Sequence, residues 1–464
     1  MLTYNFDKRG SIPLYEFLYK NIKEEILSGK FKADEKLPSK RNLAQHLKLS
    51  VVTVENAYTQ LILEGYIYSV EKRGYFICDL DEITSSVQTV RRTKSENSIN
   101  KNNYLVDLTS NNISSIKFPF SVWSKLMREI ISDHNTRLLD AAPYSGVKEL
   151  RSAISDYLYN FRGMSVSHDQ IIIGAGTEYL YSLIIQLLGR KKIYAIENPG
   201  YQKIAKIYKY NDVDYKYVDL DEYGISASKL NENCAQIVHI SPSHHFPTGV
   251  VMPIKRRNEI LKWANDKSDR YIIEDDYDSE FRFTGRPIQT LQCIDKNEKV
   301  IYINTFSKSI APSIRISYMV LPYSLLKLYK ENLSFYACTV PSFEQFTLAK
   351  FISDGYYEQH INRMRNYYKK HRDFIIKSIK ASSFGEKVTI LEENSGLHFL
   401  LSVNTNLEDA ELKRLAAKKG IKISFLSEYY HNRKSSPQHI IVINYSGVDS
   451  DRIPIAVERL SALL

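Results

Sequence analysis

Apolar residues recur at intervals of four near the start of the chain. Leu14, Leu18, Ile22 and Ile26 fall on one face of a helix, because a helix turns about every 3.6 residues. Gly29 follows as a plausible stop signal. The spacing therefore predicts an amphipathic helix that buries this apolar stripe.

Two more helices and a hairpin are predicted next. Ser39 and Ser50 are good N-caps, and each precedes a short helical pattern. The apolar positions of these two helices are Leu43, Ala44, Leu47, Val54, Ala57, Tyr58 and Leu61. Two β-like runs, IYSV and GYFI, then flank a tight turn. The order of helix, helix, turn, helix and hairpin predicts a winged helix-turn-helix.

A polar stretch from Asp79 to Asn103 interrupts the pattern. It has few large apolar residues and no sustained period, which is typical of a linker. The chain is therefore predicted to have three parts: a winged helix-turn-helix at 11–78, a linker at 79–104 and a large domain at 105–464.

The large domain alternates strand-like and helical runs. QIVHI, YIIED, KVIYINTF and YMVLP are predicted as buried parallel strands. SVWSKLMREIISD, ELRSAISDYLYNF, EYLYSLIIQLLG and EQFTLAKFI are predicted as helices. The pattern indicates an α/β fold, and such a sheet binds its ligand at the carboxyl ends of its strands.

Composition narrows the function only slightly. The net charge of +10, from 63 Lys and Arg against 53 Asp and Glu, favours DNA and a solvated basic surface about equally. The four cysteines are far apart, so we expect no metal site, no disulfides and a reducing cytoplasm. Without a signal-peptide core or a membrane-length apolar run, we expect no membrane partner.

Polar side chains gather where a winged helix meets DNA. Ser50, Thr53 and Asn56 lie near the start of the third helix, which enters the major groove in such domains. Arg41 begins the preceding helix, and the Lys72-Arg73 pair occupies the hairpin tip, where it suits phosphates. An ordinary three-helix domain with solvated charges is the alternative.

The string LPSKRNLAQHLKLSVVTVENAYTQLILEGY resembles the GntR-type winged helix. The resemblance implies that the chain binds double-stranded DNA. The DNA contacts that it implies come from Ser39, Arg41, Ser50, Thr53, Asn56, Lys72 and Arg73. In one departure, Val51 stands where the family usually has Arg, which changes one polar contact to the operator.

Three motifs in the large domain suggest a phosphate-bearing cofactor. The first is a turn that includes Gly176 and Thr177 before a helix, where free N–H groups can bind phosphate, although a purely structural turn is more common. In the second, Asp275 belongs to an acidic strand end that could also be a helix cap or a metal ligand. The third is Lys308, which follows another strand, with Arg315 seven residues later.

Ser307-Lys308 followed by Arg315 resembles the pyridoxal 5'-phosphate signature of fold-type I aminotransferases. With EDDYDSEF at 274–281 and the PTG segment at 247–249, the chain resembles the MocR family, which joins a GntR-type reader to an aminotransferase-like domain. The resemblance implies a mostly parallel sheet with helices on both faces and a smaller C-terminal α+β subdomain.

Cofactor roles follow from that resemblance. It implies that Lys308 forms an aldimine, Asp275 keeps the pyridine nitrogen protonated, Tyr277 binds the ring hydroxyl and Tyr201 stacks on the ring. The phosphate would be held by Arg315, Thr305, Ser307, Gly176 and Thr177.

Two departures affect the expected activity. Phe246 replaces an Asn that many catalytic aminotransferases have before the PTG. Val442 falls where aminotransferases place the Arg that binds the substrate α-carboxylate, and Lys203 is the candidate replacement cation. A charge-assisted hydrogen bond contributes roughly 1.5–3 kcal/mol, so its loss would weaken substrate binding.

We therefore expect a regulator that senses pyridoxal phosphate itself, or an amine or amino acid, through Lys308. We expect a head-to-tail homodimer that presents two winged helices to a direct repeat or a palindrome. One alternative is a working aminotransferase with a regulatory N-terminal domain, and another is a DNA-binding repressor whose large domain has lost its cofactor.

Overall fold

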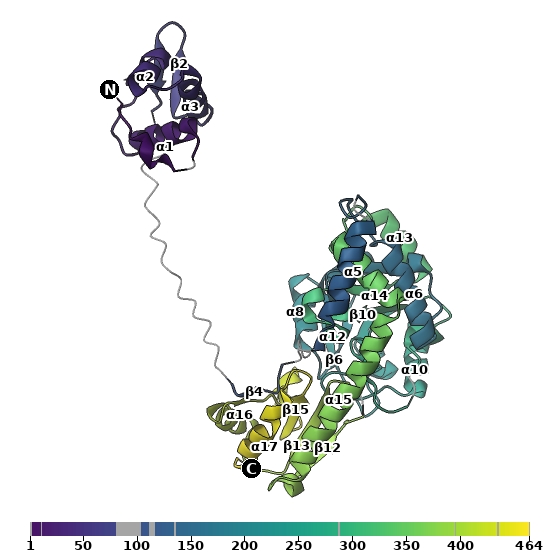
Figure 1. Cartoon of the computed structure of the whole chain (residues 1–464). Helices are drawn as coiled ribbons and strands as arrows, with labels where there is room; N and C mark the ends of the chain where they lie inside the picture. Colours follow the sequence, from purple (N-terminus) through teal and green to yellow (C-terminus); the bar gives the residue numbers. More distant parts are fainter. Residues whose placement is uncertain are drawn as a thin grey trace. The chain divides into compact units, whose positions relative to one another are not determined.

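The computed structural model describes residues 2–10, 12–79, 104–110, 117–133, 136–285, 288–394, 396–433 and 436–463. The chain divides into two compact units, residues 1–101 and 102–464 (Figure 1). Of the predicted linker, residues 80–103 lie outside the described residues. Each unit is considered by itself below.

The small unit is a winged helix-turn-helix. Its elements are η1 (Phe6–Arg9), α1 (Leu14–Leu27), β1 (Lys36–Leu37), α2 (Lys40–Leu47), α3 (Val51–Leu63), β2 (Ile67–Val70) and β3 (Gly74–Ile77). Leu18, Ile22 and Ile26 are buried in the core, as their spacing predicts. The sheet order is β1-β3-β2. The two-residue strand β1 was not predicted, because it is too short to show a period.

The large unit is built on a seven-stranded sheet in the order β5-β11-β10-β9-β8-β6-β7. Its strands are β5 (Ile171–Gly174), β6 (Tyr194–Asn198), β7 (Tyr215–Asp219), β8 (Ile237–Ile240), β9 (Tyr271–Asp275), β10 (Val300–Thr305) and β11 (Ser317–Val320). The prediction that YMVLP forms a parallel strand is wrong, because β11 is antiparallel to both β10 and β5. The connection from β10 to β11 is too short for a full crossover helix.

Helices cover both faces of this sheet. Ile171 and Ile173 pack into one hydrophobic core and Ile172 into another, because successive strand residues point to opposite faces. The helices of this sheet domain are α5 (Phe120–Asp133), α6 (Lys148–Arg162), α7 (Thr177–Leu188), α8 (Gln202–Tyr210), α9 (Ala227–Glu232), α10 (Ile254–Asn265), α11 (Leu291–Ile294), α12 (Phe306–Ser309), α13 (Tyr323–Leu333) and α14 (Ser342–Ser353).

The long helix α15 (Tyr356–Lys380) leads from this layer to a smaller C-terminal subdomain (Figure 1). The other elements there are β4 (Val106–Asp107), β12 (Val388–Leu391), β13 (His398–Val403), α16 (Asp409–Lys418), β14 (Ile421–Lys422), β15 (Ile440–Asn444) and α17 (Ile453–Ser461). The strands β12, β13 and β15 form an antiparallel sheet, and β4 pairs with β14 in parallel. Within the described part of the chain, no helix has the length and apolarity to cross a membrane.

Candidate functional site

A cavity of about 500 Å³ lies at the carboxyl ends of the parallel strands in the large unit. Its volume is in the range of small-molecule sites, roughly 300–1,000 Å³. The predicted site residues that line it are Thr177, Tyr201, Lys203, Asp275, Tyr277, Thr305, Ser307, Lys308 and Arg315. Residues from five separate chain segments therefore meet in one place, and Gly176 lies directly behind them at the start of α7.

Lys308 lies in the single turn of α12, which follows β10 directly. Thr305 caps this turn, because its side chain accepts a hydrogen bond from the Ser307 N–H at 3.2 Å. Burial lowers the pKa of Lys308 to about 8, and the nearby negative charge of Asp278 opposes that shift. Near physiological pH the ammonium form still predominates, but the neutral, nucleophilic fraction of the amine is far larger than for an exposed lysine.

Asp275 is the last residue of β9, and its carboxylate lines the cavity. Tyr181 donates a hydrogen bond of 2.5 Å to Oδ2, and His239 Nε2 lies 3.7 Å from the same oxygen. The other oxygen, Oδ1, is buried and has no hydrogen-bond partner. An unpaired buried acceptor is costly, so this atom is suited to a ligand that donates a proton.

Tyr181 and His239 were missed in the sequence. Both lie inside runs that look like apolar core, EYLYSLIIQLL and QIVHI. His239 Nδ1 also lies 2.8 Å from the Tyr208 hydroxyl, and this contact fixes the orientation of the His239 ring. A polar residue in an apolar strand was the available signal, but it does not identify the partner.

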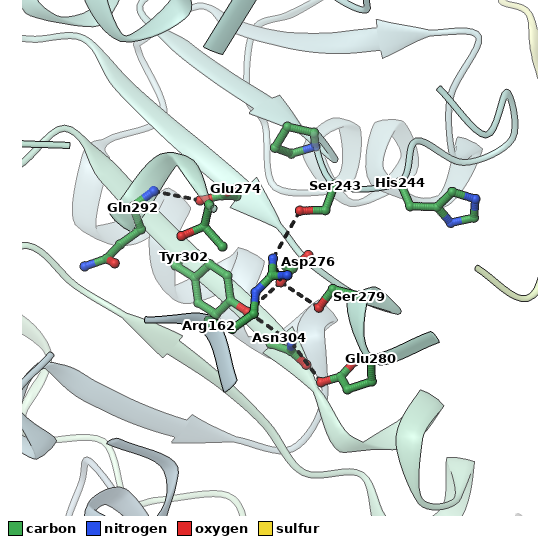
Figure 2. A network of polar contacts seen from close by, with 12 residues as sticks. Arg162, Ser243, His244, Glu274, Asp276, Ser279, Glu280, Gln292, Tyr302 and Asn304 are labelled. Carbon is green, nitrogen blue, oxygen red and sulfur yellow. Dashed lines mark hydrogen bonds and ion pairs between the residues drawn. The ribbon is translucent and has the colours of Figure 1, made fainter. Parts of the chain in front are cut away.

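The two residues that flank Asp275 serve the scaffold. Figure 2 shows Arg162, Asp276 and Tyr302 converging in a buried network. Arg162 Nη2 lies 2.7 Å from Asp276 Oδ2, and the Tyr302 hydroxyl donates to the same oxygen at 2.7 Å. Glu274 accepts the N–H of Leu291 at 2.8 Å and so caps α11. This network holds the end of β9 and thereby positions Asp275.

A cradle of hydrogen-bond donors forms at the start of α7. Gly176 has φ of +98°, and a Cβ there would collide with the Arg315 guanidinium, so glycine is required for this close approach. Ser307 Oγ is buried without a hydrogen-bond partner. The N-terminal N–H groups of α7, the Arg315 guanidinium and the Ser307 hydroxyl are donors of the kind that bind an anion.

Glu178 occupies the same cradle and was not singled out in the sequence. Arg315 Nη2 donates to Glu178 Oε2 at 2.6 Å, and Lys203 forms an ion pair with the other oxygen. Burial raises the pKa of Glu178, but the hydrogen bonds from Lys203 and Arg315 outweigh it and lower the pKa overall. Lys203, the candidate cation for an effector, is therefore already matched by a carboxylate.

Tyr277 lies beside a buried cluster of histidine side chains. Its hydroxyl lies 3.3 Å from His244 Nδ1, which lies 2.9 Å from Asp278. His398 stacks obliquely on His244 and bonds to the Pro247 carbonyl at 3.1 Å. The sequence predicted no metal site, yet nitrogen and oxygen atoms of His244, Asp278 and His398 lie within 4.8 Å of one another. The folding of β13 against the PTG segment creates this cluster, which sequence spacing cannot reveal.

Val442 lies in the middle of β15 and is fully buried. It pairs with Leu400 across the sheet and belongs to an apolar cluster that also contacts Phe246 and Tyr429. Phe246 and Tyr429 line the cavity themselves. The position predicted to lack a carboxylate-binding Arg is thus part of an apolar wall.

In the small unit, two of the predicted DNA contacts cap helices. Ser39 Oγ accepts the Asn42 N–H at 3.2 Å at the start of α2. Ser50 Oγ accepts the Thr53 N–H at 3.0 Å at the start of α3 and lies 2.7 Å from the Thr53 hydroxyl. These bonds satisfy helix N–H groups and fix the entry to α3.

Of the other predicted DNA contacts, Thr53 is half-buried and the remaining four are exposed. Arg41 lies in the first turn of α2, and Asn56 lies on the outer face of α3. Lys72 and Arg73 lie at the turn between β2 and β3. Val51, in place of the family's usual Arg, is 42% exposed, so it presents an apolar contact at the start of α3.

Two family models match the chain. Residues 14–77 match the bacterial regulatory proteins of the gntR family, and residues 103–460 match aminotransferase class I and II. These matches fall on the small and the large unit respectively.

The full-length relatives are transcription regulators. The HTH-type transcriptional regulator YdeL of Bacillus subtilis (strain 168) is 39% identical over 451 residues, which cover 97% of this chain and 96% of that protein. The probable rhizopine catabolism regulatory protein MocR of Rhizobium meliloti is 30% identical over 458 residues, which cover 96% of this chain and 92% of that protein. A kynurenine aminotransferase of Pyrococcus horikoshii covers 78% of this chain and 90% of its own, with a TM-score of 0.67 and 25% identity.

Proposed function

The chain belongs to the MocR-type transcription regulators, in which a GntR-type winged helix precedes an aminotransferase-like domain, and we propose that it couples DNA binding to occupancy of the Lys308 cavity. Pyridoxal phosphate is the cofactor of this cavity. When bound, it supplies an aldehyde carbon that bonds reversibly to primary amines.

One observation carries the cofactor assignment: a lysine of lowered pKa shares a cavity with polar atoms that lack partners. Asp275 Oδ1 is the acceptor that a protonated pyridine nitrogen requires. Ser307 Oγ and the Gly176 cradle beside Arg315 suit its phosphate. The described residues therefore fit pyridoxal phosphate at both ends of the molecule.

Each residue predicted to bind the cofactor then has a role in holding it. Lys308 would bond to its aldehyde carbon with loss of water, and Asp275 would keep its ring nitrogen protonated. Tyr277 donates to the ring hydroxyl, while Tyr201, which is half-exposed at the cavity wall, stacks on the ring. The phosphate would be held by Arg315, Thr305, Ser307, Gly176 and Thr177.

Sensing accounts for the site better than turnover does. A transaminase must orient the carboxylate of its substrate, whereas Phe246 and Tyr429, with the buried Val442 behind them, make this side of the cavity apolar. The effector is pyridoxal phosphate itself or an amine or amino acid. The intact Lys308 and Asp275 favour residual transaminase activity as the second candidate, which amino-donor-dependent turnover with an oxo acid would reveal.

Regulation requires that the ligand bind two conformations with different affinity. A head-to-tail homodimer would present two winged helices, which suits an operator that is a direct repeat or a palindrome. The DNA contacts are those predicted on α2, α3 and the β2–β3 turn. Such a regulator acts in the cytoplasm, where its DNA lies.

The visible absorption spectrum tests the cofactor site. Wild-type protein should show a band with pyridoxal phosphate that Lys308→Ala lacks. Lys262→Ala, which removes an exposed lysine of α10, is the matched control and should retain the band. A wild-type spectrum identical to that of free pyridoxal phosphate would overturn the proposal.

A further inference from the structure

The cavity has an aromatic wall, and only its Tyr201 ring has a role in holding the cofactor. The Phe246 ring lies 5.2 Å from the Tyr429 ring and 6.1 Å from the Tyr201 ring, and both pairs meet edge to face. Ile204, Ile207 and Tyr217 extend the same lining. Behind Phe246 and Tyr429, the fully buried cluster of Leu400, Leu426 and Val442 supports them. A ligand body that contacts this wall gains by being apolar.

The charged residues of the cavity lining also favour a ligand body that carries no negative charge. Among the described residues that line the cavity, the cations are Lys203, Lys308 and Arg315. Lys203 and Arg315 both pair with Glu178, and the cofactor would bind to Lys308 and Arg315. The acids Glu178 and Asp275 line the same cavity, as does Glu197, whose pKa burial raises to about 8 so that it is largely neutral.

A carboxylate on the ligand would therefore lie among apolar and acidic side chains. Each cation of the lining already has another partner. Burial of an ionised group without a hydrogen-bonded partner is strongly unfavourable. The same ligand without its carboxylate avoids that cost and keeps its contacts with the aromatic wall. A binding site discriminates more strongly between two ligands when one of them would bury an unpaired charge than when they differ by one methylene group.

We propose that the second ligand of this cavity, beside the cofactor, is a primary amine with an apolar or aromatic body and no carboxylate. This inference rests on the proposed function, because it assumes pyridoxal phosphate on Lys308. It assigns specificity to the wall of Phe246, Tyr429 and Tyr201. Decarboxylated amino acids have this chemistry.

The test uses full-length protein loaded with pyridoxal phosphate and pairs of ligands that differ only by a carboxylate. Phenethylamine is compared with L-phenylalanine, and isopentylamine with L-leucine. The dissociation constant is read from the visible band and, independently, from the shift in Tm. Each ligand is also titrated against free pyridoxal phosphate, so that its intrinsic amine reactivity can be divided out.

We expect each amine to bind at least ten-fold more tightly than its amino acid, which corresponds to about 1.4 kcal/mol. Phe246→Ala should weaken both amines several-fold, whereas Tyr210→Ala, which removes an aromatic ring of α8 that is 82% exposed, should not. Phe246→Arg should narrow or invert the preference, since a guanidinium can hold a carboxylate through two hydrogen bonds.

The outcomes separate the inference from the proposed function. A wild-type protein that forms the Lys308-dependent band but binds amino acids as well as amines overturns the inference alone. A band that responds to neither ligand also overturns it and leaves pyridoxal phosphate as the sole effector. The absence of any Lys308-dependent band overturns the proposed function itself.

Discussion

Glu178→Gln should tighten the binding of pyridoxal phosphate by about five-fold. In the unliganded cavity, the Glu178 carboxylate holds Arg315 at 2.6 Å and also pairs with Lys203. An incoming phosphate must take Arg315 from this carboxylate and then remain beside its negative charge. The variant keeps a hydrogen-bond acceptor for Arg315 but removes the competing charge.

The magnitude follows from the exposure of the pair. The Arg315 and Glu178 side chains are 49% and 36% exposed, so their ion pair belongs to the class worth roughly 0.2–1 kcal/mol. Repulsion between carboxylate and phosphate adds to the cost of binding, which brings the total to about 1 kcal/mol. That free energy corresponds to a change of roughly five-fold in the dissociation constant.

The assay is a titration of cofactor-free protein with pyridoxal phosphate, followed by visible absorption at low and high salt. The difference between wild type and variant should shrink at high salt, because exposed charges are screened. Glu232→Gln, an exposed change at the end of α9, is the control and should leave the affinity unchanged. Equal or weaker binding by Glu178→Gln would refute the reasoning.

Three further predictions follow from the same geometry. Asp275→Asn should weaken pyridoxal phosphate binding about ten-fold in the same titration, since a charge-assisted bond to the ring nitrogen is lost. The rate at which cofactor-free protein takes up pyridoxal phosphate should rise with pH around a midpoint near 8, as the Lys308 amine loses its proton; a midpoint near 10.5 would contradict the lowered pKa. Arg162→Met should lower the free energy of unfolding in urea by about 3–5 kcal/mol, because it leaves Asp276 buried without its cation.

The fold of the small unit could be predicted because its signals are local. The stripe through Leu18, Ile22 and Ile26 and the caps at Ser39 and Ser50 need only neighbouring residues to be recognised. The direction of β11 could not be predicted this way. Its apolar run is the same whether its neighbours run parallel or antiparallel, and the short return from β10 decides the matter.

In the candidate site, too, some residues could be predicted from local sequence and others could not. Lys308, Asp275 and Arg315 could be recognised because each lies at a strand end or in a motif with fixed spacing. Tyr181 and Glu178 could not be assigned roles, because their partners lie 94 and 137 residues away in the chain. Only the packing of α7 against the end of β9 and against the segment just before β11 brings these pairs together.

The most direct test of the central claim is the affinity of the full-length protein for DNA as the Lys308 cavity is filled. Fluorescence anisotropy on fragments selected from a randomised pool would compare protein without cofactor, with pyridoxal phosphate, and with pyridoxal phosphate plus phenethylamine. We predict that at least one ligand state changes the dissociation constant for DNA five-fold or more, about 1 kcal/mol of coupling, and that Lys308→Ala removes the change. Equal DNA affinity in all three states of the wild-type protein would contradict the account.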